Sequence, residues 1–344
     1  MKLHMSAVCK PVHQVQVQPL VGFQGGSINQ VGLNFDTMFR PKGKVIFVIG
    51  ATGTGKSRLA IDLATRFPAE IINSDKMQVY RNLDITTNKV TEDECRGVPH
   101  HLLGNVYDPQ SNFSAADFCH QASSSIESIL SRGRLPIIAG GSNSYIDALI
   151  NDHHNHRRTQ FRLRYDCLFL WVDVSIPVLQ GFVSERVDRM VAAGLVDEVR
   201  QIFDPTADYS RGIRRAIGVP ELDEYFRAES RGASEKTKAI LLRYAIDKIK
   251  QNTCKLACRQ LQKINNLHDN WSWNTHRLDA TEAFLKRGRG QDADGAWEKL
   301  VAGPGTMIVD DFLYSEGLPT MLPNDAVLTT SPVSLAPVVA AVTR

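Results

Sequence analysis

One octapeptide has the composition and spacing of a phosphate-binding loop. Residues 50–57 (GATGTGKS) match G-x-x-x-x-G-K-[ST], follow the apolar run 45–49 and precede a helical pattern, the context in which this motif is specific. The glycines let backbone N–H groups turn toward an anion, and the N-terminus of the following helix adds partial positive charge. Lys56 supplies an ammonium group, and the Ser57 hydroxyl can bind Mg²⁺. We therefore predict a di- or triphosphate site formed by Gly50, Ala51, Thr52, Gly53, Thr54, Gly55, Lys56 and Ser57.

The loop alone does not identify the phosphate compound. A nucleotide-hydrolysing motor or a kinase also needs an acid at the end of a later strand, where it organises Mg²⁺ and water. Asp173, after the apolar run 168–172, has that position, but an aspartate that ends a strand in a turn fits the residue better. The run at 135–139 ends in Gly140 and Gly141, with no acid.

The elements around the loop alternate between strand and helix. Short apolar runs predict strands at 45–49, 70–73, 135–139 and 167–174. Leu59, Leu63 and Phe67, at i, i+4 and i+8, predict a helix after the loop, and further helices fit 114–132 and 142–150. A βαβ pattern of this kind predicts an α/β fold with a mainly parallel, P-loop NTPase-like sheet flanked by helices.

The chain divides into four parts. We predict a flexible leader at 1–43 and a P-loop α/β core at 44–175. A mainly helical part at 176–300 completes the core and the acceptor site, where a second substrate binds, and a flexible tail follows at 301–344. The tail is rich in proline, which interrupts regular elements. In the leader, Asp36 is the one acid beside four lysines and arginines, as in an organelle transit peptide. This favours a plastid location, and a cytoplasmic protein with a plain N-terminal tail is the alternative.

Overall composition excludes some classes of protein. The net charge of +3 is too small to argue for nucleic acid, and no run approaches 18 apolar residues, so we expect no membrane span. The six cysteines are scattered and are expected to be free thiols.

An ordered series of short motifs accompanies the phosphate loop. In chain order they are NSDKMQVY (73–80), VPHHLL (98–103), SAADF (114–118), AGGSNSY (139–145), ERVDRM (185–190), GLVDEV (194–199), RAIGV (215–219) and LACRQ (256–260). The series spans about residues 45–265 and resembles the isopentenyltransferase, or dimethylallyltransferase, family.

The resemblance implies a reaction and roles for particular residues. Members of this family transfer a five-carbon allyl group from dimethylallyl diphosphate to N6 of adenine, either in tRNA or in a free nucleotide. The phosphate loop and Mg²⁺ then hold the donor diphosphate, and Thr52 adds a hydroxyl donor. Asp75 matches the general base, which an amino group with a delocalised lone pair requires. Arg186 matches the arginine that binds the diphosphate.

Three departures from the tRNA-acting members favour a free nucleotide. Only about twenty residues separate Tyr145 from Cys167, too few for the helical insertion of those enzymes. No cysteine follows Cys258, so the zinc finger of the eukaryotic members is missing, and Cys254 and Cys258 replace two basic residues. The chain therefore resembles the plant branch that makes cytokinin precursors, with no nucleic-acid or membrane partner.

The acceptor phosphates need positive charge. Residues 208–263 hold 13 lysines and arginines against 7 acids, with Arg211, Arg214 and Arg215 as the tightest cluster. These arginines and Ser74 are the predicted acceptor-binding residues, and they would favour ATP or ADP over AMP by Coulomb attraction. A solvated basic face is the alternative for the arginines, and a tRNA-modifying enzyme and a P-loop kinase are the alternative functions.

Overall fold

The computed structural model describes residues 42–151, 160–271 and 275–314 of the chain, and the structural statements below refer to them. The strands are β1 (Gly43–Ile49), β2 (Ala69–Asn73), β3 (His100–His101), β4 (Leu135–Ala139), β5 (Tyr165–Asp173) and β6 (Thr275–Asp279). The α-helices are α1 (Lys56–Arg66), α2 (Glu92–Cys95), α3 (Ala115–Ser131), α4 (Asn143–Asn151), α5 (Gln160–Arg164), α6 (Ile176–Ala192), α7 (Leu195–Arg200), α8 (Asp223–Ser230), α9 (Glu235–Trp271), α10 (Thr281–Gly288), α11 (Ala293–Trp297) and α12 (Gly303–Tyr314). Short 3-10 turns η2 (Gly212–Arg215) and η3 (Pro220–Leu222) and a π-helical turn η4 (Glu298–Ala302) complete the elements.

The strands form one sheet in the order β3-β2-β4-β1-β5-β6, and each pairing is parallel. β1 lies between β4 and β5, with Phe47 opposite Ile138 on one side and Phe169 on the other. The chain moves from β1 to one side of the sheet for β2 and later to the other side for β5. In open parallel sheets, ligands bind beyond the carboxyl ends of the strands at such a switch point. The phosphate loop begins there.

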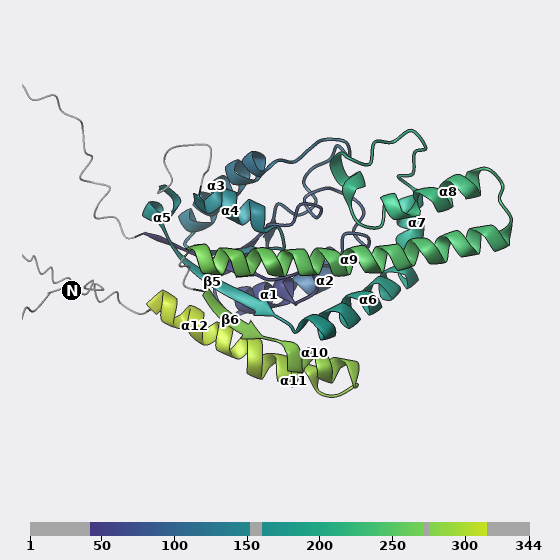
Figure 1. The fold of residues 1–344 in the computed structure, drawn as a ribbon. Coiled ribbons are helices and arrows are strands. Elements are labelled where there is room, and N and C mark those ends of the chain that lie inside the picture. The colour runs from purple at the N-terminus through teal and green to yellow at the C-terminus, as the bar shows by residue number, and fades with distance from the viewer. Residues whose placement is uncertain (1–41, 152–159, 272–274, 315–344) are drawn as a thin grey trace, which may run out of the picture. The chain divides into compact units, whose positions relative to one another are not determined.

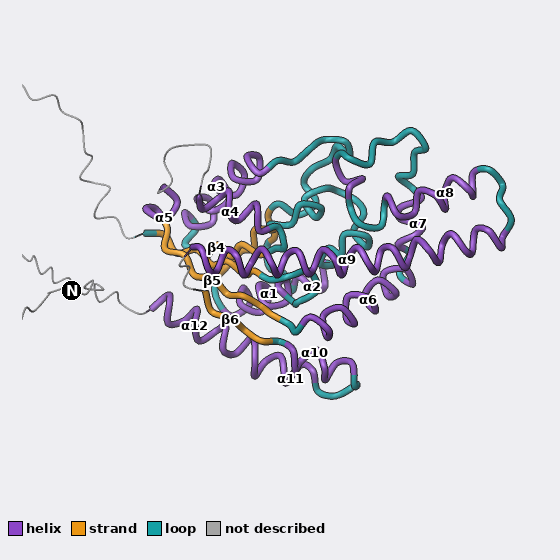
Figure 2. Tube along the Cα trace, in the orientation of Figure 1, coloured by secondary structure: helices purple, strands orange, loops and turns teal. Residues whose placement is uncertain are grey.

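Both faces of the sheet are covered, as a parallel sheet requires. α1 and α12 pack on one face, and α3, α4 and α5 pack on the other (Figure 1). The long helix α9 packs along α6 and also contacts α8 and α4 (Figure 2). No helix in the described ranges is long and apolar enough to cross a membrane.

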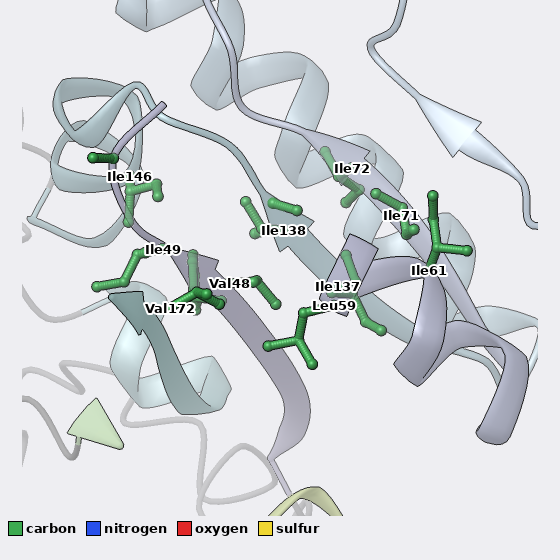
Figure 3. Close-up of a cluster of buried hydrophobic side chains, with 14 of the residues drawn as sticks. Val48, Ile49, Leu59, Ile61, Ile71, Ile72, Ile137, Ile138, Ile146 and Val172 are labelled. Carbon is green, nitrogen blue, oxygen red and sulfur yellow. The ribbon is translucent and has the colours of Figure 1, made fainter. Parts of the chain in front are cut away.

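The core between these layers consists of branched aliphatic side chains. Figure 3 shows Val48 of β1 and Ile137 of β4, the neighbouring strand, beside Leu59 of α1, all buried. Phe47 stacks on Phe169 with ring centroids 4.7 Å apart. This packing holds α1, and with it the phosphate loop, against the centre of the sheet.

The predicted P-loop-type parallel fold is confirmed, with two differences near the C-terminus. β6 lies in the part predicted to be mainly helical; its sequence THRLD has few apolar residues because β6 is an edge strand. The chain also stays helical to Tyr314, past the predicted start of the flexible tail at 301. Pro304 is tolerated because the π-helical turn η4, closed by a hydrogen bond from Gly303 N–H to Glu298 O, precedes it and widens the helix there.

A buried carboxylate on β2 contributes to stability in a pH-dependent way. Burial would raise the pKa of Glu70, but hydrogen bonds from His101 Nε2 (2.7 Å) and Arg132 Nη2 (2.8 Å) outweigh it and lower the pKa overall. We expect Glu70→Gln to reduce the free energy of unfolding at neutral pH by about 2 kcal/mol, since it removes a buried carboxylate that pairs with partly exposed arginines, Arg132 and Arg134. Urea unfolding measures this.

The lowered pKa makes the stabilisation by Glu70 depend on pH. The contribution of Glu70 is complete above the pKa of an unfolded glutamate and is lost as the pH falls through its folded value. The difference in free energy of unfolding between wild type and Glu70→Gln should therefore become smaller in acid. Glu127→Gln, which breaks an exposed pair with Arg164, is the control and should cost less than about 1 kcal/mol. An equal difference in free energy of unfolding at neutral and acid pH would contradict this role of the Glu70 carboxylate.

Candidate active site

A cleft of about 870 Å³ opens at the carboxyl ends of the strands. Its walls come from the phosphate loop, the segment after β2, the loop after β4, and helices α6, α9, α10 and α11. The predicted site residues on its surface are Thr52, Gly53, Gly55, Lys56, Ser57, Asp75, Arg186 and Arg215. Gly50, Ala51 and Thr54 of the loop, and Ser74, Arg211 and Arg214, do not line it.

The phosphate loop has the backbone conformation that its sequence predicts. Gly53 has φ 87°, a left-handed value, and a Cβ atom there would lie 2.6 Å from Val183 of α6. Thr54 Oγ1 donates to Ala51 O at 3.0 Å inside the loop. The loop is therefore a closed turn whose shape depends on glycine, placed at the N-terminus of α1.

Lys56 is a buried cation at the bottom of the cleft. Its Nζ donates to Ala51 O at 2.6 Å. Burial lowers the pKa of Lys56 to about 8; the nearby Asp75 carboxylate opposes this shift, and Arg186 adds to it. An ammonium group in this position is stabilised further by any bound anion.

Arg186 approaches the same loop from α6. Its Nη2 donates to Thr52 Oγ1 at 3.1 Å, which brings two residues with predicted donor roles together. The buried Nε has no hydrogen-bond partner within the described part of the chain. Burial and the neighbouring Arg189 lower the pKa of Arg186 to about 10, against the attraction of Asp75. A buried, unused donor on a cation favours binding of an anion here.

Asp75 faces these cations from the segment after β2. Its Oδ1 accepts the Met77 N–H at 2.9 Å, a turn that fixes the side chain. Oδ2 lies beside Gly141 and receives no hydrogen bond from the residues that the structure describes. One carboxylate oxygen is thus fixed, and the other is available at the cleft.

A second group of cations lies on the Asp75 side. Partial burial, together with Lys263 and Arg215, lowers the pKa of Lys76, and Asp75 acts in the opposite direction. Lys76 Nζ lies 5.1 Å from the centroid of the Tyr145 ring. Lys76 stands in the NSDKMQVY motif but has no predicted role there, and Lys263 carries no signal of its own in a chain with 40 lysines and arginines.

The other predicted acceptor residues lie elsewhere. Arg211 is exposed, and Arg214 Nη2 donates to Ile202 O at 3.2 Å. The Ser74 hydroxyl is buried beside Gly140 and has no hydrogen-bond partner among the described residues. Of the arginine cluster, the geometry brings only Arg215 to the cleft.

Gln260 of α9 connects two loops of the site. Its Oε1 accepts the Thr52 N–H at 2.7 Å, and its Nε2 donates to Gly141 O at 2.8 Å. The residue closes the last motif of the sequence, but this bridge needs the three-dimensional positions of both loops to be seen. Gln260 holds the phosphate loop against the glycine turn after β4.

Asp173 does not reach the cleft. Arg277 of β6 donates to Asp173 Oδ2 through Nη2 at 2.6 Å and through Nε at 2.9 Å. The position favours the strand-end role over a Mg²⁺-organising role.

No group of three or more histidine, cysteine or acidic side chains that could hold a metal exists in the ranges described. The exposed hydroxyl of Ser57 at the cleft is compatible with Mg²⁺, which usually takes one or two protein ligands and completes its shell with phosphate oxygens and water.

Comparison with known proteins identifies the class. A sequence model of the family described as IPP transferase matches residues 78–161 and 151–266. The chain is 59% identical to adenylate isopentenyltransferase 5, chloroplastic, of Arabidopsis thaliana, over 95% of this chain and 98% of the relative. It is 55% identical to adenylate isopentenyltransferase 7, mitochondrial, of the same plant, over 91% of each. An adenylate isopentenyltransferase of Humulus lupulus is 43% identical, over 77% of this chain and 89% of the relative.

Solved structures agree in fold. A eukaryotic dimethylallyltransferase acting on tRNA superposes with a TM-score of 0.67 at 24% identity, over 81% of this chain and 82% of that one. The tRNA isopentenylpyrophosphate transferase from Bacillus halodurans gives a TM-score of 0.61 at 26% identity, over 80% of this chain and 100% of that one.

The fold and the cleft define a P-loop-type transferase. The chain belongs to the IPP transferase family, and it is therefore a prenyltransferase.

Proposed function

We propose that the protein transfers the dimethylallyl group from dimethylallyl diphosphate to N6 of a free adenine nucleotide, ATP or ADP in preference to AMP. The observation that carries the proposal is that the phosphate loop and Asp75 line the same cleft, with Asp75 near enough to Lys56 and Arg186 to interact with their charges. The names of the relatives, adenylate isopentenyltransferases, support the same acceptor class. In plants this reaction begins cytokinin synthesis.

In the proposed donor site, the phosphate loop, Lys56 and Arg186 bind the diphosphate. Mg²⁺, when held by Ser57 and phosphate oxygens, would neutralise charge on the leaving group. As the bond between C1 of the donor and the diphosphate oxygen breaks, negative charge grows on that oxygen. The cations of the loop stabilise this charge without having to rearrange.

Apolar side chains near these cations suit the five-carbon chain. The cleft surface includes Val187 and Met190 from α6, Ile217, and Leu256 from α9. Because such walls exclude water, they protect an allylic carbon with cationic character from hydrolysis.

On the acceptor side, Asp75 receives the proton. The N6 lone pair forms the new bond to C1, the C1–O bond breaks, diphosphate leaves, and one N6 proton passes to the free Oδ2 of Asp75. Lys76, Arg215 and Lys263 would then attract the acceptor phosphates, which carry more charge in ATP and ADP than in AMP.

The chain itself favours a free nucleotide over tRNA. Only residues 152–159 separate the end of α4 from the start of α5, at the position where tRNA-acting enzymes insert a helical domain. Two of the relatives compared above carry chloroplastic or mitochondrial in their names, which supports organelle targeting, in a plastid by preference, for this protein. The predicted leader at 1–43 lies almost wholly outside the described residues.

Diphosphate release distinguishes this function from that of a kinase. Purified protein with Mg²⁺, dimethylallyl diphosphate and ATP should release one diphosphate per prenylated nucleotide, and ATP should keep all three phosphates. Phosphate transfer from ATP without consumption of the prenyl donor would refute the proposal and favour a kinase.

The pKa of Lys56 predicts the alkaline limb of the pH profile. Because its pKa is about 8, Lys56 loses its charge above that pH in the free enzyme, and the anionic donor then binds less well. We expect kcat/KM for the donor to fall as the pH rises above about 8, measured by initial rates at low donor concentration. In Lys56→Arg the guanidinium stays charged, so this limb should move to higher pH, although the overall rate is lower. An identical limb in Lys56→Arg would contradict the assignment.

A further inference from the structure

Helices α10, α11 and α12, with the π turn η4, form a C-terminal hairpin (residues 281–314) that touches the phosphate loop directly. Trp297, the last residue of α11, is 3% exposed and lines the cleft. Gly55, which precedes α1, has φ 94°, and a Cβ atom there would lie 2.6 Å from Cη2 of the indole ring. The ring therefore lies against the backbone of the last loop residue before Lys56.

The helix that follows the loop holds this ring in place. Trp297 Nε1 donates to Asp62 Oδ2 at 2.8 Å, and the Arg58 guanidinium carbon lies 4.7 Å from the ring centroid. Arg96, from the segment after α2, also pairs with Asp62. The indole thus has both a hydrogen bond and a cation–π contact to α1, and its single N–H donor is already used.

This placement gives the ring an effect on anion binding. A left-handed glycine next to a phosphate site must hold its N–H group in one direction, and glycine has the largest conformational freedom of all residues. A rigid ring packed on its Cα limits that freedom. The hairpin lies after residue 266, where the match to the family model ends.

We infer that Trp297 is a positioning residue for the donor diphosphate: through Gly55 it fixes the phosphate loop in its anion-binding conformation, and Asp62 orients the ring. The inference rests on the proposed function, since it assigns the diphosphate to this loop. Trp297 acts through the loop and is not expected to bond to the diphosphate itself.

The test compares variants of the full chain that weaken the hairpin at different points. Trp297→Leu removes the ring, and Trp297→Phe keeps an aromatic ring but loses the bond to Asp62. Arg66→Ala is the matched control: Arg66 joins α1 to the hairpin through Glu298 (2.6 Å) and Thr306 (2.7 Å), away from Gly55. Binding of inorganic diphosphate with Mg²⁺ is measured by calorimetry, the Michaelis constants of donor and acceptor by initial rates, and stability by thermal melting.

We expect Trp297→Leu to weaken diphosphate binding and raise the donor KM by about tenfold or more, because small displacements at a binding site have large effects. Trp297→Phe should show a smaller loss of the same kind, and the acceptor KM should change by less than about twofold. Arg66→Ala should lower the melting temperature and leave diphosphate affinity unchanged.

Two results would overturn the inference: diphosphate affinity in both Trp297 variants equal to wild type, or a loss in Arg66→Ala as large as that in Trp297→Leu at the same loss of stability. If the wild-type protein itself binds no diphosphate, the proposed donor site fails, which is a different result. If Trp297→Leu does not fold, the diphosphate affinity of Trp297→Phe still tests the inference.

Discussion

Asp75→Asn should abolish most of the prenyl transfer and leave donor binding intact. Asparagine keeps a carbonyl oxygen that can accept the Met77 N–H at the position of Oδ1, so the turn after β2 survives. It cannot accept a proton from the attacking N6, however, and general base catalysis typically contributes about 10²- to 10⁴-fold. We expect kcat to fall within that range, measured by the mass-detected rate of adduct formation under saturating donor and acceptor.

The binding measurement separates a base from a purely electrostatic residue. Inorganic diphosphate should bind Asp75→Asn at least as well as wild type, because the variant removes a negative charge that faces Lys56 and Arg186. Asp75→Glu is a second variant that retains the carboxylate and should recover part of the rate. A fall in kcat of less than about fivefold would exclude Asp75 as the base.

Arg186→Met should have the second large effect. Methionine keeps the apolar, unbranched stem on α6 but has no charge, so the diphosphate loses a cation whose buried Nε has no partner among the described residues. Removing one preorganised donor of this kind typically costs about 10²- to 10³-fold in rate. We expect that loss in kcat/KM for dimethylallyl diphosphate, with weaker product inhibition by diphosphate and little change in the acceptor KM.

Thr52 provides the matched comparison. Thr52→Ala removes the hydroxyl that Arg186 contacts but keeps the backbone N–H that donates to Gln260, so we expect about a tenfold loss, the value of one hydrogen bond. Since the two side chains are in contact, the double variant should lose less than the product of the single losses. Strictly multiplicative losses, or an Arg186→Met enzyme with normal donor kinetics, would contradict a shared diphosphate site.

The sequence predicts the centre of this molecule better than its edges. The phosphate loop and strands β1, β2, β4 and β5 follow from local signals, because a glycine-rich turn and short buried apolar runs leave few alternatives. β6 and α12 have no such signal: an edge strand needs little apolar character, and Pro304 is compatible with a helix only because of the π turn before it.

The candidate site likewise contains some residues that the sequence predicts and others that only the structure reveals. Lys56, Asp75 and Arg186 carry motif signals, and the structure brings all three to one cleft. Arg211 and Arg214 have the same charge as Arg215, but only the Arg215 side chain lines the cleft. Charge density in a sequence does not report where a side chain points. Gln260 and Trp297 act through contacts more than 200 residues away in the chain, to Thr52 and Gly55, which local patterns do not encode.

The identity of the prenylated acceptor tests the proposed function most directly. Purified protein is incubated with Mg²⁺ and dimethylallyl diphosphate in one tube that contains ATP, ADP, AMP and unmodified tRNA, and each product is identified by mass and by fragmentation at the adenine. We predict a single dimethylallyl group on N6 of ATP and ADP, less on AMP and none on tRNA. Modification of tRNA alone, or no adduct on any acceptor, would contradict the claim that this cleft prenylates free adenine nucleotides.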